Sequence, residues 1–191
     1  IASLGTISKW SSKDIGENEI IVSKFPSSSY SEAFRQFRTN LQFAVASRPS
    51  KFLLVTSPGP GEGKTTVLCN LASVIAQTGK RVIIVDGDLR RPAIHRRFQL
   101  QNRDPGLSSF LAQPNTNIGD VLIATEQEGV AVVPSGPIPP NPSELLGSSR
   151  MEELLQQLEK LADVVLLDSP PLLVVADTAV IAAQADGVIL V

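Results

Sequence analysis

Residues 52–66 read FLLVTSPGPGEGKTT, and this stretch decides the fold. It begins with a short, mostly apolar, β-like run and continues into a loop dense in glycine and proline. Lys64 and Thr65 then open an apolar run with helix-forming character. A glycine-rich loop between a strand and a helix is what a phosphate-binding loop requires. The order of strand, loop and helix therefore predicts a nucleotide-binding domain.

The residue types of the loop indicate how it would hold phosphates. Gly61 and Gly63 lack a Cβ, so their backbone N–H groups can turn inward, and the helix N-terminus adds partial positive charge. Lys64 can reach the β- and γ-phosphates, and the Thr65 hydroxyl can hold Mg²⁺. Pro58 departs from the general G-x-x-x-x-G-K-[ST] pattern, which has its first glycine there. We expect the phosphates of a bound nucleotide to lie against eight residues: Gly59, Pro60, Gly61, Glu62, Gly63, Lys64, Thr65 and Thr66.

Composition bounds the class of protein. The chain has 191 residues, of which 42% are apolar, and this suits one domain with a sizeable core. The formal net charge of −2 gives no electrostatic reason to expect nucleic acid as a partner. The single cysteine, Cys69, excludes an intrachain disulfide, and a packed thiol is expected there. The sequence shows neither a signal peptide nor a transmembrane span.

The segments after the loop alternate between strands and helices. Near-continuous apolar runs predict four further strands, at residues 81–85, 129–133, 164–167 and 187–191. Such runs indicate an α/β fold, with a parallel sheet covered by helices on both faces. Ligands bind these sheets beyond the carboxyl ends of the strands. The residues that directly follow the carboxyl ends of four predicted strands are Ser57, Asp86, Pro134 and Asp168, and we expect them to lie near a bound ligand.

The two ends of the chain differ in character from its centre. Residues 1–28 are rich in serine and weakly patterned, so we expect a linker or a packed arm before the domain at residues 29–191. A helix is predicted to begin at Ser29, which has capping-box spacing to Glu32. The run at residues 187–191 resembles a strand cut at its end, and the chain does not begin with Met. We therefore expect a piece of a longer protein, truncated in its last strands.

Carboxylates follow two of the predicted strands. Asp86 and Asp88 come directly after one strand, and Asp168 follows another. These side chains would project at the same sheet edge as the glycine-rich loop, and three carboxylates beside a triphosphate require a cation. Mg²⁺ fits, because it prefers carboxylate, hydroxyl, water and phosphate oxygens. The structural alternative is that Asp88 caps the following helix and that Asp168 starts a turn.

Further motifs carry a family resemblance. Residues 83–90 read IIVDGDLR, which fits three apolar residues followed by D-x-D-x-R. Residues 165–171 read VLLDSPP, which fits a Walker B pattern of three apolar residues followed by D-[ST]-P-P. Glu32, Arg35 and Arg38 fit E-x-x-R-x-x-R. Together with the loop, these motifs make the predicted domain resemble the cytoplasmic kinase domain of bacterial tyrosine kinases, which belong with the exopolysaccharide co-polymerase proteins.

The resemblance implies a P-loop NTPase fold of the partition-ATPase type and a tyrosine autokinase that uses ATP, releases ADP and needs Mg²⁺. It implies that Lys64 neutralises the β- and γ-phosphates and that Thr65, Asp88 and Asp168 surround Mg²⁺. Asp86 is then the best candidate to accept the tyrosine hydroxyl proton. The assignment of base and metal ligand between Asp86 and Asp88 stays open at this point. The implied catalytic set is Lys64, Asp86, Asp88 and Asp168.

Two other functions remain as alternatives. ATPases that position cell-division and partition machinery share the implied fold, but they usually carry a signature lysine five residues before the invariant one. Gly59 occupies that position here, which favours the kinase branch. The second alternative is a nucleotide-gated oligomerisation module without tyrosine transfer.

The resemblance also implies partners and a location. Glu32, Arg35 and Arg38 would join subunits into a homo-oligomer such as a ring, although they also fit an i,i+3 salt-bridge ladder. Family members regulate exopolysaccharide or capsule synthesis at the cytoplasmic face of the bacterial inner membrane, with a membrane co-polymerase or activator region on the same chain or on a partner. Their Tyr-rich tail, phosphorylated between subunits, is missing from this sequence. Its one tyrosine, Tyr30, is expected to be a packing residue.

A basic cluster follows the second aspartate. Two interpretations are open: a solvated helix face, or a docking surface for a neighbouring subunit or an acidic tail. The cluster consists of Arg90, Arg91, His95, Arg96 and Arg97.

Overall fold

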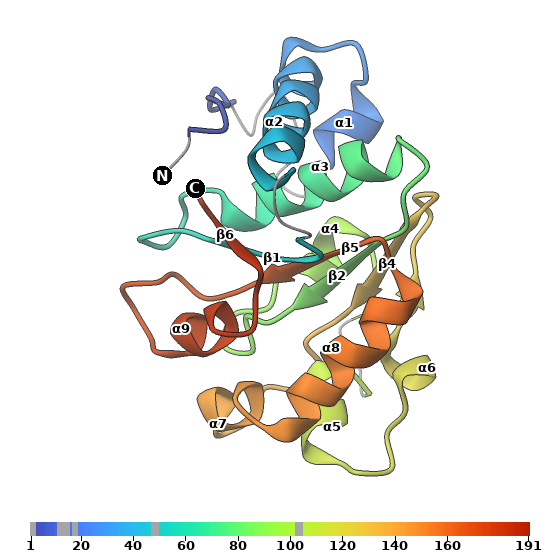
Figure 1. The fold of residues 1–191 in the computed structure, drawn as a ribbon, viewed down its shortest axis with the longest axis vertical. Coiled ribbons are helices and arrows are strands. Elements are labelled where there is room, and N and C mark those ends of the chain that lie inside the picture. The colour runs from blue at the N-terminus through green and yellow to red at the C-terminus, as the bar shows by residue number, and fades with distance from the viewer. Residues whose placement is uncertain (1–2, 11–15, 17–18, 47–49, 102–104) are drawn as a thin grey trace.

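Six strands form one sheet in the computed structural model, which describes residues 3–10, 16, 19–46, 50–101 and 105–191. The strands are β1 (Phe52–Thr56), β2 (Val82–Asp86), β3 (Ile123–Ala124), β4 (Val130–Val133), β5 (Val164–Asp168) and β6 (Gly187–Leu190). They lie in the order β3-β4-β2-β5-β1-β6, between two layers of helices (Figure 1). This order places β5 between β2 and β1, so the strands followed by the predicted site residues are neighbours.

Five of the described strands run parallel, as predicted, and the sixth does not. β2 pairs in parallel with β4 and β5, and β1 with β5 and β6. β3 pairs antiparallel with β4, with Ile123 opposite Val132. The five predicted strands are therefore parallel, and β3, which the sequence did not predict, adds an antiparallel strand at one edge. β3 has two residues and returns into β4 through a short turn, and only antiparallel strands can be joined so closely.

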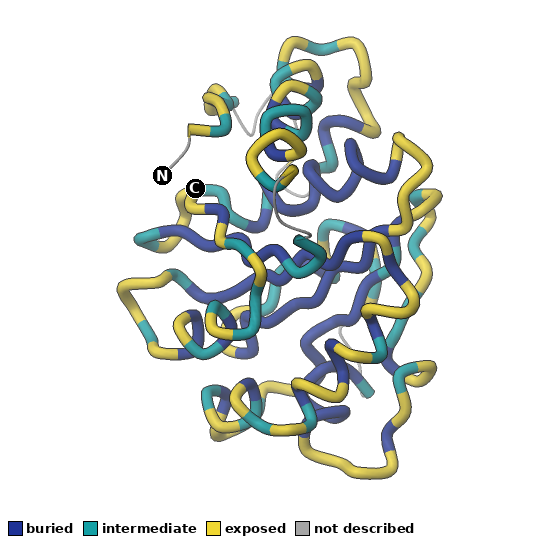
Figure 2. Tube along the Cα trace, viewed as in Figure 1, coloured by how far each residue is buried: buried dark blue, intermediate teal, exposed yellow. Residues whose placement is uncertain are grey.

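The central strands are buried on both faces, as their apolar runs predict (Figure 2). Successive side chains of a strand point to opposite faces of the sheet. In β5, Val164 and Leu166 belong to one hydrophobic core, and Val165 and Leu167 belong to the other. The sheet therefore separates two cores, each closed by its own layer of helices.

Helices α1 (Ile21–Lys24), α2 (Ser29–Val45), α3 (Lys64–Ala76) and α4 (Ile94–Arg97) cover one face. α3 lies against the sheet and α2 packs on α3. The other face carries α5 (Leu107–Ala112), α6 (Ile118–Val121), α7 (Pro142–Leu146), α8 (Ser149–Leu161) and α9 (Asp177–Ala182). None of the helices in the described part of the chain combines the length and the apolar character needed to cross a bilayer.

The segment before α2 packs onto this framework. Ile21 and Val22 are fully buried, and the Val22 N–H donates to Asn70 Oδ1 at 3.1 Å. Tyr30 meets Trp10 edge to face, with ring centroids 5.6 Å apart, so Tyr30 has the packing role that was expected. Cys69 is buried in α3, as predicted, and burial raises the pKa of its thiol.

The predicted cap of α2 is wrong by one residue. The N-cap is Ser28, whose hydroxyl accepts a hydrogen bond from the Ser31 N–H at 3.1 Å. Residues 27–29 are all serine, so the sequence pattern cannot distinguish their positions. Ser28 is selected by its extended backbone, because a cap must stand outside the helix while its side chain reaches inward.

Candidate nucleotide and metal site

The site lies where three neighbouring strands end. Asp86 of β2 is in register with Asp168 of β5, and Asp168 is in register with Val55 of β1. The glycine-rich loop leaves the end of β1 and leads directly into α3. Because the strands are parallel, the loop and the carboxylates meet at one edge of the sheet. The structure therefore brings together residues separated by more than one hundred positions, as the sequence predicted.

Two glycines give the loop its shape. Gly61 and Gly63 have φ angles of 77° and 101°, in a region that strains L side chains. A Cβ on either would meet no described atom within 4 Å, so backbone conformation, and not crowding, requires glycine here. Gly63 is the N-cap of α3, which directs the first N–H groups of the helix into the loop. The Gly59 N–H donates to Glu62 Oε2 at 2.8 Å, so Glu62 braces the loop.

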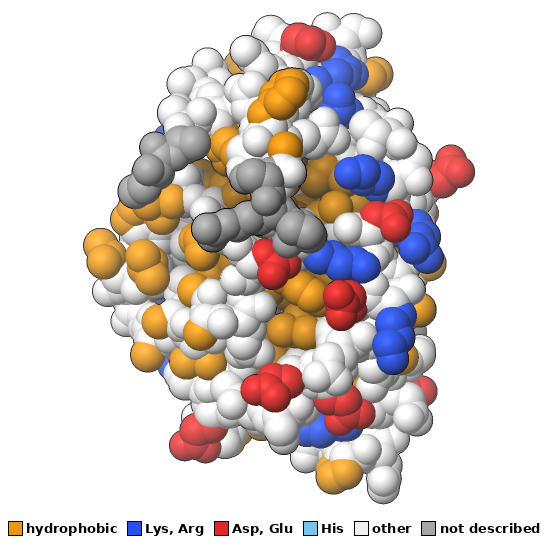
Figure 3. Space-filling view, viewed as in Figure 1, with side chains coloured by type: hydrophobic (Ala, Val, Ile, Leu, Met, Phe, Trp, Pro, Cys, Tyr) orange, Lys and Arg blue, Asp and Glu red, His pale blue; other side chains and the backbone are white. Residues whose placement is uncertain are grey.

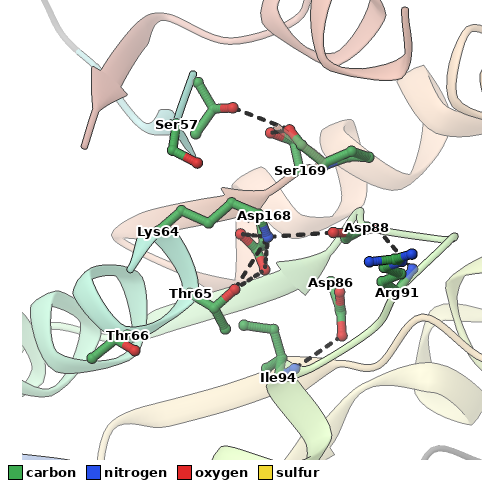
Figure 4. A network of polar contacts seen from close by, with 12 residues as sticks. Ser57, Lys64, Thr65, Thr66, Asp86, Asp88, Arg91, Ile94, Asp168 and Ser169 are labelled. Atoms are coloured by element: carbon green, nitrogen blue, oxygen red, sulfur yellow. Dashed lines mark hydrogen bonds and ion pairs between the residues drawn. The ribbon is translucent and has the colours of Figure 1, made fainter. Parts of the chain in front are cut away.

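Lys64 is the centre of the polar network in Figure 4. Its Nζ lies 3.3 Å from Asp88 Oδ2 and 3.4 Å from Asp168 Oδ1. Nζ also lies 3.2 Å from Thr65 Oγ1, which in turn donates to Asp168 Oδ2 at 2.9 Å. The two carboxylates and the hydroxyl therefore converge on one cationic point. The Asp168 side chain is fully buried, and that of Lys64 is 13% exposed.

Burial and charge act against each other in this network. Burial lowers the pKa of Lys64, but the charges of Asp168 and Asp88 outweigh burial, and the net pKa is raised. Burial raises the pKa of Asp168, and the charge of Lys64 and the hydrogen bond from Thr65 offset only part of this effect. A buried carboxylate needs a cation. In this structure the Lys64 ammonium supplies it.

Asp86 lies beside this network but bonds differently (Figure 4). Its Oδ2 accepts the Ile94 N–H at 3.1 Å, while its Oδ1 is buried without a hydrogen-bond partner among the described residues. Burial raises the pKa of Asp86 well above its usual range, and the charges of Asp168 and Asp88 raise it further. A carboxylate with a raised pKa is a stronger base. The unpartnered oxygen is an acceptor that a ligand or a water molecule can satisfy.

The donor set fits Mg²⁺. Thr65, Asp88 and Asp168 offer one hydroxyl and two carboxylates, all hard oxygen ligands. Within the described ranges, no group of three His, Cys, Asp or Glu side chains forms a metal centre by itself. Mg²⁺ is commonly held by one or two carboxylates together with phosphate and water oxygens. These residues therefore suit a cation that arrives with a nucleotide.

A cavity opens beside the loop. Its wall includes Gly61, Glu62 and Thr66 of the loop, Arg97 of α4, and residues 5–10. The Arg97 guanidinium donates to Thr66 Oγ1 at 2.8 Å, so two residues of the cavity wall, one from α4 and one from the start of α3, are bonded to each other. This space adjoins the residues expected to hold phosphates.

The basic cluster is not one solvated face. Arg90 forms a bidentate pair with Asp177, and Arg97 bonds to Thr66, so two of its arginines have partners within the chain. These contacts join residues 87 and 31 positions apart, and no short-range pattern reveals them. On the face seen in Figure 3, basic and acidic side chains of the described residues are interspersed. That distribution agrees with the absence of a net basic charge.

The predicted oligomerisation stripe also has partners within its own chain. Arg35 pairs with Glu32 at 3.0 Å and donates to Pro26 O at 2.7 Å. Arg38 turns onto α3 and donates to Val74 O at 3.0 Å, while its Nε is buried without a partner among the described residues. Glu32 is the most accessible of the three, with 73% of its side chain exposed.

Similarity to known proteins agrees with this geometry. The family described as an AAA domain matches residues 51–191. Tyrosine-protein kinase YwqD of Bacillus subtilis (strain 168) is 42% identical over 175 residues, covering 92% of this chain and 73% of that protein. The kinase domain of Escherichia coli tyrosine kinase ETK superposes with a TM-score of 0.92 at 34% identity, covering 100% of this chain and 78% of that one.

Fold and site together define a P-loop nucleotide-binding domain. Within that class, the chain belongs to the family of bacterial tyrosine-protein kinases. Relatives differ widely in length: the putative tyrosine-protein kinase EpsB of Ralstonia solanacearum is 42% identical over 172 residues. That match covers 90% of this chain but 23% of EpsB.

Proposed function

We propose that this chain is the Mg·ATP-dependent kinase domain of a protein-tyrosine autokinase. The observation that carries the proposal is the convergence of two carboxylates and a hydroxyl on the Lys64 ammonium, at the mouth of a phosphate-binding loop. The kinase names of the relatives support the same reaction. ATP is the phosphoryl donor and ADP is the product.

Each residue of the site has a proposed task. Backbone N–H groups of residues 59–66 hold the phosphates, Lys64 neutralises the β- and γ-phosphates, and the nucleoside extends toward the cavity beside Thr66. Thr65, Asp88 and Asp168 hold Mg²⁺. When bound, Mg²⁺ offsets negative charge on the phosphate oxygens. The protein contributes mainly position and charge, which is how enzymes catalyse phosphoryl transfer.

The proposed reaction is an in-line displacement. The tyrosine phenol oxygen forms a bond to the γ-phosphorus, and the bond from that phosphorus to the β,γ-bridging oxygen breaks. ADP leaves with the electron pair, and the phenol proton passes to the Asp86 carboxylate. Asp86 suits this task because it bonds to neither Lys64 nor Thr65 and has a raised pKa.

Incubation with labelled ATP, Mg²⁺ and a Tyr-rich peptide is expected to yield phosphotyrosine. The matched control is the same peptide with Phe in place of each Tyr, which should remain unlabelled. Normal binding of Mg·ATP with no phosphotyrosine would contradict the kinase proposal. Vigorous ATP hydrolysis without transfer would favour a partition-type ATPase instead.

The proposed setting follows from the family. The acceptor is the Tyr-rich tail of a neighbouring subunit, and the domain works at the cytoplasmic face of the bacterial inner membrane. Its partner is a membrane co-polymerase or activator region, on the same chain or on another. The phosphorylation cycle regulates synthesis and export of an exopolysaccharide or capsule. The kinase family of the relatives supports this setting.

A second proposal concerns assembly: Glu32, Arg35 and Arg38 join subunits into a homo-oligomer gated by nucleotide. Arg35→Ala with Arg38→Ala is expected to lower the mass measured by light scattering in the presence of Mg·ATP. Glu32 and Arg35 are accessible enough to exchange their mutual pair for one with a neighbour. Arg81→Ala is the control, because Arg81 is an exposed arginine in an ion pair away from this helix. An unchanged mass in the double variant would contradict the assembly role.

A further inference from the structure

The start of α9 contacts the loops that follow β2 and β5, the two strands that end in Asp86 and Asp168. Asp177 and Thr178 are its first two residues, and they are 0% and 1% exposed. One reaches the loop after β2, and the other reaches the loop after β5. None of the tasks proposed above uses either residue.

Asp177 holds the loop after β2 through Arg90. Arg90 Nε donates to Asp177 Oδ2 at 2.8 Å and Nη2 donates to Oδ1 at 3.1 Å, a bidentate arrangement. Ser143 of α7 also donates its hydroxyl hydrogen to Asp177 Oδ1. Paired N–H donors fix direction as well as distance, so this contact orients the guanidinium strongly. Arg90 stands two residues after Asp88.

Thr178 holds the loop after β5. Its hydroxyl donates to Pro170 O at 2.6 Å, and Thr56 of β1 donates to the same oxygen at 3.1 Å. Pro170 stands two residues after Asp168. The start of α9 is therefore bonded directly to the loop after β5. Through Asp177 it is also bonded to the loop after β2, which carries Asp88.

A third contact holds the loop after β2 close to the end of β5. A Cβ on Gly87 would lie 2.5 Å from Asp168 O and 3.0 Å from Ile181 Cδ1 of α9. The loop after β2 thus lies directly against β5 and α9, and only glycine permits this approach. Asp88 therefore stands between two held points of this loop, the close approach at Gly87 and the ion pair at Arg90.

We propose that Asp177 is a positioning residue that acts through Arg90 to set the separation of Asp88 and Asp168, and thereby the affinity for Mg²⁺. This inference rests on the proposed function, in which those two carboxylates hold the cation. Arg90 is then a structural tether that holds the loop after β2. This role is not evident from its side chain being 44% exposed, or from its position in a basic cluster of the sequence.

The test is ADP binding by calorimetry, with and without Mg²⁺, for Asp177→Asn and Arg90→Gln. Asn keeps the size of Asp but loses the charge and one acceptor of the bidentate pair. Partners that orient metal ligands typically change metal affinity by about 10–100-fold. We expect the gain in ADP affinity on adding Mg²⁺ to fall roughly tenfold in each variant, while ADP affinity without Mg²⁺ stays unchanged.

The double variant tests whether the two residues form one unit. If Asp177 acts through Arg90, Asp177→Asn with Arg90→Gln loses no more of the Mg²⁺ effect than either single variant, because coupled residues are not additive. If the losses of the Mg²⁺ effect in the two single variants add up in the double variant, Asp177 does not act through Arg90. Arg90→Gln alone still decides the question if Asp177→Asn fails to fold.

Asp163→Asn is the matched control. Asp163 also forms a bidentate pair, with Arg81. This pair joins the beginnings of β2 and β5, at the end of the strands opposite the site. The control should keep the full Mg²⁺ effect. An undiminished Mg²⁺ effect in folded Asp177→Asn and Arg90→Gln would overturn the inference, whereas a wild-type chain whose ADP affinity ignores Mg²⁺ would overturn the proposed function itself.

Discussion

Lys64→Met is expected to abolish tyrosine phosphorylation, with a loss of about 10³-fold in turnover, the scale seen when one preorganised transition-state contact is removed. Met has nearly the length of Lys and no charge, so it keeps the shape of the loop and removes the cation. Charge builds on the transferring phosphoryl group and its leaving oxygen, and Lys64 is the residue placed to offset it. The measurement is the rate of phosphotyrosine formation at saturating Mg·ATP.

The same substitution should also lower stability. Lys64 is the cation between Asp88 and Asp168, whose side chains are 6% and 0% exposed. Removing one partner of a buried ion pair leaves uncompensated charge and costs about 3 kcal/mol. Chemical denaturation of Lys64→Met without Mg²⁺ should show this loss.

Two variants separate the catalytic loss from the structural one. Lys64→Arg keeps a positive charge beside the carboxylates, so it should retain most of the stability while turnover still falls, because guanidinium and ammonium are not interchangeable. Lys80→Met removes an exposed lysine outside the site and should change neither quantity. Turnover near the wild-type rate in Lys64→Met would exclude Lys64 from the reaction.

The convergence of the glycine-rich loop and the carboxylates was predictable, because each of these parts obeys local rules. Each of the five parallel strands coincides with an apolar run of the sequence, and Asp86 and Asp168 are the last residues of β2 and β5. Parallel strands place their carboxyl ends at one edge, so the sequence predicts the meeting of loop and carboxylates without any knowledge of strand order. The order itself then makes Asp86 and Asp168 register partners.

The features that were missed depend on distant or very short segments. β3 has two residues, too few for any periodicity to emerge. Arg90 and Asp177 lie 87 positions apart, and in the sequence Arg90 resembles one more member of a basic cluster. Asp177 interrupts an apolar stretch and could be taken for a simple helix start. Only the packing of α9 against the loop after β2 shows that Arg90 and Asp177 form an ion pair.

Asp86→Asn and Asp168→Asn are expected to fail in different ways. Asp168 contacts both Lys64 and Thr65, so its loss removes a ligand from the proposed Mg²⁺ site and should weaken Mg·ATP binding by at least tenfold. Asp86 contacts neither of them; its one hydrogen bond among the described residues comes from the Ile94 N–H. Asp86→Asn should therefore bind Mg·ATP almost normally.

Phosphotyrosine formation completes the comparison. Loss of a general base typically costs about 10²–10⁴-fold in rate, so Asp86→Asn should lose transfer while it retains the nucleotide. Asp88→Asn assigns the remaining role, because a metal ligand should behave like Asp168→Asn and a base like Asp86→Asn. Equal losses of Mg·ATP binding in Asp86→Asn and Asp168→Asn would contradict the division into base and ligand. The contacts of the site favour that division, because Lys64 pairs with both Asp88 and Asp168 and leaves the buried Oδ1 of Asp86 available to a proton.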